Sequence, residues 1–137
     1  MPESGNDYIL VVDDVAFVRR LFVGIISELG HKVEEAESGE QALELITINP
    51  PRLIFLDLMM PQMSGFDVCE WIRANEATKK TPVVICTANR ERMTLEHAIR
   101  SGATDILCKP VTKEGISTRL KRHLHDVVPQ PESQVHA

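Results

Sequence analysis

Short apolar runs alternate along the chain with segments whose apolar residues lie three or four positions apart. The runs are typical of strands buried on both faces of a sheet, and the wider spacing is typical of amphipathic helices. The pattern predicts strands at residues 8–12, 32–36, 53–57, 82–86 and 105–108. It predicts helices after each of them, at about residues 15–29, 39–48, 65–74, 92–100 and 113–125.

Strict alternation of strands and helices favours one α/β domain with a parallel sheet covered by helices on both faces. Parallel neighbours need crossover connections, and the helices supply them. The weakly apolar segment 32–36 suits an edge of the sheet. Ser38 and Thr112 are predicted N-caps, and Gly30 is a predicted C-cap. One apolar stripe of the first helix is expected to face the core: Val18, Leu21, Phe22, Ile25, Ile26 and Leu29.

Polar side chains stand where four of the predicted strands end. Asp13 and Asp14 follow the first strand, Asp57 ends the third, Thr87 follows the fourth and Lys109 follows the fifth. Each has an ordinary explanation by itself, such as capping a turn. Because the carboxyl ends of parallel strands share one edge of the sheet, we expect all of these side chains to meet there. Their meeting favours a functional site.

The residue types at this edge indicate phosphoryl chemistry. Three carboxylates repel one another at pH 7 unless a cation joins them. Oxygen ligands favour Mg²⁺, with Mn²⁺ as a substitute, over zinc. Lys109 can pair with a carboxylate at rest and with a phosphoryl oxygen in use, and the Thr87 hydroxyl can donate to another such oxygen. The set suits transfer of a phosphoryl group to a carboxylate.

The composition excludes several other classes of function. A hydrophobic fraction of 43% with 26% charged residues is ordinary for a globular domain, and a net charge of -5 argues against direct nucleic-acid binding. The three cysteines lack CxxC spacing and are expected to be reduced and mostly buried. No apolar run reaches the roughly 18 residues of a membrane span, and the chain has no signal-peptide start. We therefore expect a cytoplasmic protein without a membrane partner. His31 and His97 are interpreted as ordinary surface residues.

Taken together, the motifs resemble those of response-regulator receiver domains of two-component signalling, over about residues 8–125. That family has a flavodoxin-like fold with strand order 2-1-3-4-5, which we therefore expect here. Residues 1–7 would be an extension, and residues 126–137 a natural tail or the start of a linker. The resemblance rests on these motifs: Val12-Asp13-Asp14, Asp57 with Met60-Pro61 and Gly65, Thr87-Ala88, and Lys109-Pro110.

The resemblance implies a role for each residue of the predicted site. Asp57 would accept a phosphoryl group from a phosphohistidine, and Thr87 and Lys109 would bind the phosphoryl oxygens. The Lys109-Pro110 peptide would be cis, a conformation found almost only before proline. The metal would be held by Asp13, Asp14, Asp57 and the backbone carbonyl of Met59.

One position departs from the family pattern. Receivers usually carry Tyr or Phe three residues before the lysine of the last strand, where the ring turns inward as the threonine moves. This chain has Ile106 there, so the Thr87 half of the switch can operate but the aromatic half cannot.

The resemblance also implies partners. A sensor histidine kinase or a histidine phosphotransfer protein would dock near the helix at 15–29, where Phe17 and Val23 fall off the buried stripe and Val15 lies beside the acids. The signal would leave through a face formed by residues 92–100, 105–108 and 113–125, to a homodimer partner or an output domain.

Two alternatives remain. A pseudo-receiver would act as a binding surface without phosphorylation. An aspartyl-phosphate phosphatase would turn over small substrates, but dehalogenase-type enzymes carry a D-x-D pattern after the first strand and need a cap domain, whereas Asp13 and Asp14 are adjacent. We expect no enzyme activity beyond self-catalysed phosphoryl acceptance and autodephosphorylation.

Overall fold

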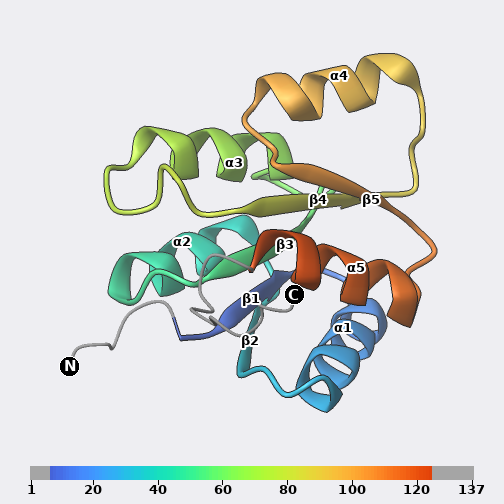
Figure 1. The fold of residues 1–137 in the computed structure, drawn as a ribbon. Helices are drawn as coiled ribbons and strands as arrows, with labels where there is room; N and C mark the ends of the chain where they lie inside the picture. Colours follow the sequence, from blue (N-terminus) through green and yellow to red (C-terminus); the bar gives the residue numbers. More distant parts are fainter. Residues whose placement is uncertain (1–6, 125–137) are drawn as a thin grey trace, which may run out of the picture.

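The computed structural model describes residues 7–124 and confirms the predicted α/β fold (Figure 1). The strands are β1 (Ile9–Val12), β2 (Val33–Ala36), β3 (Leu53–Asp57), β4 (Val83–Thr87) and β5 (Asp105–Cys108). The helices are α1 (Ala16–Glu28), α2 (Gly39–Ile48), α3 (Gly65–Ala74), α4 (Arg92–Arg100) and α5 (Lys113–His123). The predicted helix end at residue 125, the tail at 126–137 and nearly all of the N-terminal extension lie outside the described residues.

All neighbouring strands pair in parallel, in the order β2-β1-β3-β4-β5. The prediction of an edge position for residues 32–36 is confirmed, since β2 is the first strand of this order and its two glutamates are exposed. β3 lies in the centre, and all of its residues are buried. The central position of β3 explains its almost wholly apolar sequence.

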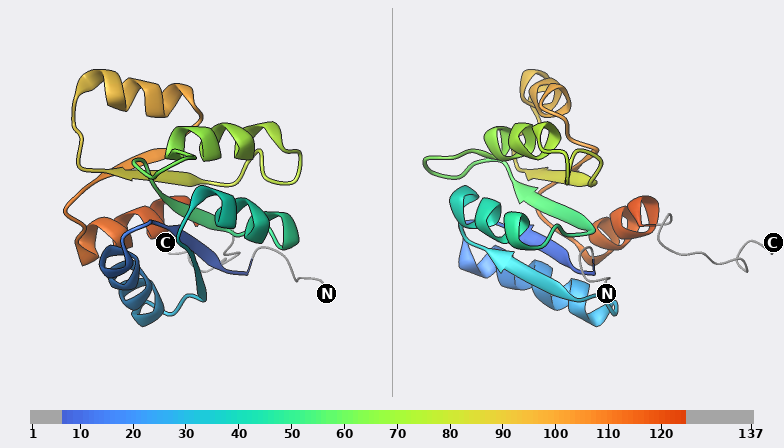
Figure 2. Two further views of the ribbon diagram at one scale, coloured as in Figure 1. Left: turned by 180° about the vertical axis from the view of Figure 1, so that it is seen from behind. Right: turned by 90° about the vertical axis from the view of Figure 1, so that its left-hand side faces the viewer.

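Alternate residues of the strands supply two apolar cores, one on each face of the sheet. Leu10, Val12, Ile54 and Leu56 pack under α2, α3 and α4, whereas Ile9, Val11, Leu53 and Phe55 pack under α1 and α5. Figure 2 shows these helices on the two sides of the sheet. The two layers hold β1, β3 and β4 in place, so the carboxyl ends of these strands form a fixed edge.

Local hydrogen bonds set the ends of several helices. Ser38 accepts a hydrogen bond from the backbone of Gln41, and Thr112 accepts one from Gly115, which confirms both predicted N-caps. Gly30 follows α1 with a φ of 95°, the left-handed conformation that favours glycine after a helix.

The expected buried stripe of α1 is wrong at one position. Phe22 and Ile26 are buried and Val18, Ile25 and Leu29 are partly buried, but the side chain of Leu21 is 40% exposed. Successive helical residues are turned by about 100°, so Leu21 lies at the margin of the stripe rather than at its centre. Leu21 is instead one turn from exposed Phe17, on the outer side of α1.

None of the helices in residues 7–124 is both long enough and apolar enough to cross a membrane.

Candidate functional site

Three carboxylates predicted to meet at the carboxyl edge of the sheet do so. One oxygen each of Asp13, Asp14 and Asp57 lies within 4.8 Å of the other two. Asp13 and Asp57 are buried, and Asp14 is exposed. Each follows or ends a strand whose apolar residues are fixed in the core, so the backbone brings the acids together. This oxygen-rich cluster is chemically suited to a divalent cation such as Mg²⁺.

Lys109 neutralises part of this charge. Its Nζ lies 2.9 Å from Asp57 Oδ1 and 3.1 Å from Asp13 Oδ2. Burial opposes the charge of the ammonium, but hydrogen bonds and attraction to the two carboxylates raise the pKa of Lys109 above its ordinary value. The lysine therefore stays charged between the buried acids.

The carboxyl of Asp57 still has a raised pKa, despite its contact with Lys109. Burial raises the pKa of its carboxyl to about 6, against the hydrogen bond from Lys109, and repulsion from Asp13 and Asp14 adds to the rise. The ammonium of Lys109 thus does not offset both the burial of Asp57 and the repulsion from its two neighbouring acids. A second cation at the cluster would favour the ionised form of Asp57. The site therefore fits a divalent metal.

The loop that follows β3 wraps closely around Asp57. The backbone nitrogen of Gly65 donates to the carbonyl of Leu58, at 2.9 Å. A Cβ at position 65 would lie 2.5 Å from the carbonyl oxygen of Asp57, so only glycine fits there. Met59 lies in this loop with an exposed side chain. The Lys109-Pro110 peptide, which follows β5 at the same edge of the sheet, is cis.

Thr87 lies at the end of β4, beside β3. It is buried, and its Oγ1 accepts a hydrogen bond of 3.0 Å from the backbone nitrogen of Asn89. The Thr87 carbonyl accepts a hydrogen bond from the backbone of Lys109. The strands thus place Thr87 and Lys109 on the same edge as Asp57.

Arg19 positions the acidic pair, and sequence reasoning missed it. Its guanidinium donates to the backbone carbonyl of Asp13 at 2.8 Å and to Glu35 Oε1 at 2.7 Å, which ties the loop after β1 to β2. Asp13 Oδ1 also accepts a hydrogen bond from the backbone of Val15. The position of Arg19 in the first turn of a predicted helix could have indicated this role. A positive charge near a helix N-terminus is unfavourable unless an acceptor or an acid pairs with it.

Ile106 lies on β5, partly buried against the core under α2, α3 and α4. Nearby, the ring of His97 on α4 stacks on Phe66 of α3, with centroids 3.6 Å apart and planes 15° apart. His97 is exposed, as interpreted from the sequence, but the stack was not predicted. Its geometry depends on how α4 packs beside α3, which neither local sequence specifies.

The outer side of α1 presents apolar side chains beside the acids. Phe17 is 77% exposed, and Val15 and Leu21 are also exposed. Val23, which was grouped with Phe17 from the sequence, is partly buried.

Comparison with known proteins agrees with this fold. The family model of the response regulator receiver domain matches residues 9–121. A probable chemotaxis protein CheY of Rhizobium etli is 33% identical over 114 residues, which cover 82% of this chain and 88% of that protein. The transcriptional regulatory protein ResD of Bacillus subtilis is 34% identical over 121 residues, or 88% of this chain and 49% of ResD. The chain therefore spans about half the length of ResD.

Solved structures show the same architecture. The chemotaxis protein CheY4 of Vibrio cholerae matches with a TM-score of 0.83 and 28% identity, covering 88% of this chain and 100% of that chain. The receiver domain of NtrX from Brucella abortus matches with a TM-score of 0.79 and 33% identity, covering 85% and 98%. On the family model, the relatives and the observed strand order, this chain belongs to the response regulator receiver domain family of two-component systems.

Proposed function

We propose that Asp57 accepts a phosphoryl group from a phosphohistidine of a sensor histidine kinase or a histidine phosphotransfer protein. The observation that carries this proposal is a buried carboxylate held 2.9 Å from an ammonium, with two further acids beside it. A carboxylate oxygen of Asp57 attacks phosphorus, the P–N bond breaks, and the donor imidazole keeps the electron pair and recovers a proton. The product is an acyl phosphate.

The residues around Asp57 suit this transfer. With a pKa of about 6, the carboxyl is mostly ionised at pH 7 and can act as the nucleophile. Lys109 can move its donors from the carboxylate to a phosphoryl oxygen, and the Thr87 hydroxyl can donate to another. Thr87 already lies at the end of the neighbouring strand, so a small shift would suffice.

Asp13, Asp14, Asp57 and the backbone carbonyl of Met59 would hold Mg²⁺, or Mn²⁺ in its place. The metal would neutralise charge on the transferred group and let the acids lie close together. The clustering of three carboxylate oxygens within 4.8 Å supports this assignment, and burial together with repulsion from Asp13 and Asp14 raises the pKa of Asp57, which a bound cation would oppose.

The exposed apolar side of α1 supports docking of the phosphodonor there, and α4, β5 and α5 are the proposed output face. Phosphorylation would move Thr87 without an aromatic partner at Ile106. The output face would meet a homodimer partner or an output domain that follows a linker at residues 126–137. We propose a cytoplasmic signalling module at residues 8–125, with no direct nucleic-acid contact and no enzyme activity beyond acceptance and loss of its own phosphoryl group.

Acetyl phosphate tests this proposal against the two alternatives. In Mg²⁺ the protein should gain one phosphoryl group by intact mass, and hydroxylamine should remove it. The gain should disappear with EDTA and in Asp57→Asn, while Glu76→Gln serves as an exposed control. An unlabelled wild type with intact fold would favour the pseudo-receiver. Repeated turnover of a phosphorylated metabolite would favour the phosphatase.

A further inference from the structure

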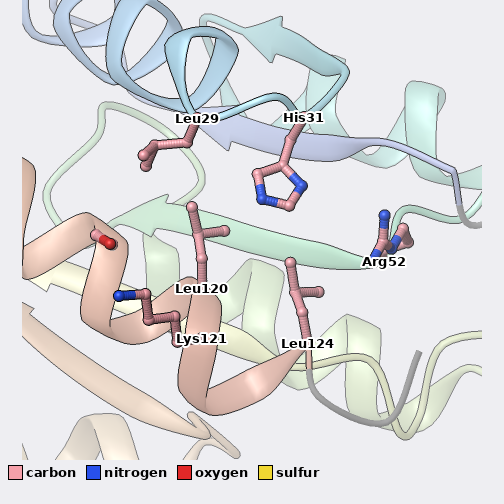
Figure 3. Close-up of a pocket in the computed structure, with 7 residues that line it drawn as sticks. Leu29, His31, Arg52, Leu120, Lys121 and Leu124 are labelled. Carbon is pink, nitrogen blue, oxygen red and sulfur yellow. The ribbon is translucent and has the colours of Figure 1, made fainter. Parts of the chain in front are cut away.

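A pocket of about 320 Å³ lies far from the acidic cluster, near the amino ends of the central strands. It is formed by the end of α1, the residue before β3 and the last turns of α5 (Figure 3). Its volume is at the lower end of the range in which small organic ligands bind. The side chains that line it are Leu29, His31, Arg52, Ser117, Leu120, Lys121 and Leu124.

The pocket joins an apolar wall to nitrogen-bearing side chains. Leu120 and Leu124 are buried in the core between α1 and α5, and Leu29 packs against the same core. In Figure 3, His31 and Arg52 lie across the pocket from Leu124. An occupant would therefore meet both aliphatic side chains and hydrogen-bond donors.

These donors have no acid to pair with among residues 7–124. No carboxylate there forms an ion pair with His31, Arg52 or Lys121, whereas Arg19, Arg119 and Arg122 each pair with one. The Nε of Arg52 is buried and finds no hydrogen-bond acceptor in the described part of the chain. A buried donor without an acceptor is costly. The guanidinium of Arg52 is not held by a partner within the described residues and can turn its other nitrogens toward a ligand.

The charge of the pocket matches a single negative charge. Burial and the nearby Arg52 lower the pKa of His31, so its imidazole is neutral at pH 7 and offers a hydrogen bond rather than a second charge. Lys121 is exposed at the rim, where solvent screens it. The guanidinium of Arg52 is left as the main charge, and its planar fork matches a carboxylate.

We propose that this pocket binds a small organic monoanion, a carboxylate with an aliphatic body. The carboxylate pairs with Arg52 and His31, and the aliphatic chain covers Leu29, Leu120 and Leu124. This inference is independent of phosphoryl acceptance at Asp57, because none of its residues belongs to the acidic cluster.

Octanoate is a suitable probe, followed by amide NMR shifts of the full chain. We expect saturable shifts at residues around the pocket, with a dissociation constant on the order of 1 mM. Acetate has the charge without the chain, and octylammonium has the chain with the opposite charge. Both should bind at least about tenfold more weakly, since each lacks one half of the recognition.

Two matched variants test the role of Arg52. Arg52→Gln should weaken octanoate binding by about tenfold or more, and Arg100→Gln on α4 should leave it unchanged. Lys121→Gln, at an exposed position, should weaken it less, and the comparison of octanoate with octylammonium on the wild type keeps the test decisive if Arg52→Gln unfolds. Equal binding of octylammonium, or octanoate binding that survives both pocket substitutions, would overturn the proposal. Shifts that follow protein concentration rather than octanoate would assign the pocket to a second copy of the chain and would also overturn it.

Discussion

β3 and β5 belong to one sheet but are stabilised in different ways. Every residue of β3 is buried, and the following helix α3 buries Gly65, Val68, Cys69 and Ile72. β5 is an edge strand that buries only Leu107, and α4 before it buries only Ala98. The region of β3 and α3, which carries Asp57, is therefore fixed by a closed core, whereas the α4–β5 region relies on contacts at its surface.

The surface contacts of the second region are specific. The carboxylate of Asp105, at the start of β5, forms ion pairs with Arg122 at 2.7 Å and with His123 at 2.8 Å. Arg119 lies 3.6 Å from the same carboxylate. These partners all come from α5, so one carboxylate fastens the edge strand to the last helix. Polar pairing here replaces the apolar burial that holds β3.

The largest effect should follow from removing the ammonium of Lys109, which lies between Asp13 and Asp57. Lys109→Met leaves buried Asp13 and Asp57 without their ammonium, and breaking a buried pair is strongly destabilising. We expect the free energy of unfolding in EDTA to fall by about 3 kcal/mol, measured with urea. Lys79→Met, which breaks an exposed pair with Glu76, should cost less than about 0.5 kcal/mol. Equal losses in the two variants would contradict the contrast between buried and surface pairing.

Two glycines give the next comparison. Gly65→Ala places a Cβ 2.5 Å from the carbonyl of Asp57, and this backbone cannot give way cheaply. We expect a loss of about 2 kcal/mol together with weaker metal binding. In α1, Gly24→Ala meets nothing within 4 Å and should stabilise the helix by about 0.5–1 kcal/mol. Thermal unfolding with and without Mg²⁺ distinguishes them, and a tolerated Gly65→Ala would show that the loop after β3 is less constrained than its packing indicates.

The same contrast explains how far the sequence alone could lead. The position of Asp57 was predictable, because four buried apolar residues before it leave a central strand as the simplest solution. Leu21 was not, since an apolar residue at the margin of a helical stripe can be buried or exposed. The Phe66–His97 stack and the pocket at Arg52 arise where elements distant in sequence meet. Periodicity indicates the centre of the face that each element buries, but neither the margin of that face nor which side chains of two elements meet at the surface.

A smaller effect, with a defined pH dependence, should follow at Asp105. Burial raises its pKa, but hydrogen bonds from His123, the Ile106 backbone and Arg122 outweigh this and hold the pKa below its ordinary value. Such a carboxylate stabilises the fold above its unfolded pKa of about 3.9, and the stabilisation is lost as the pH falls through the lower folded value. Asp105→Asn should therefore cost about 1–2 kcal/mol at pH 7.

The cost of Asp105→Asn should shrink as the pH falls below about 4, where the wild-type carboxyl becomes protonated first in the unfolded chain and then, at its lower pKa, in the folded protein. Urea unfolding at pH 7 and at successively lower pH gives the difference directly. Glu96→Gln, in an exposed pair with Arg92, is the control and should show a difference near zero at each pH. A cost at Asp105 that stays constant into acid would mean that shape rather than charge holds β5 to α5.

The smallest effect on stability should be the most informative about the proposed output face of α4, β5 and α5. The Phe66–His97 stack joins α3 to α4, whose single buried residue is Ala98. An aromatic pair contributes about 0.5–1.5 kcal/mol beyond burial, and exposure of His97 places this pair at the lower end. His97→Ala should barely change global unfolding but should speed hydrogen exchange of α4 several-fold, because local opening has a smaller free energy than global unfolding. Met93→Ala, an exposed residue of the same helix, is the matched control. If both variants exchange like wild type, α4 is held by its backbone connections and Ala98 alone, and the ring stack has no part in its mobility.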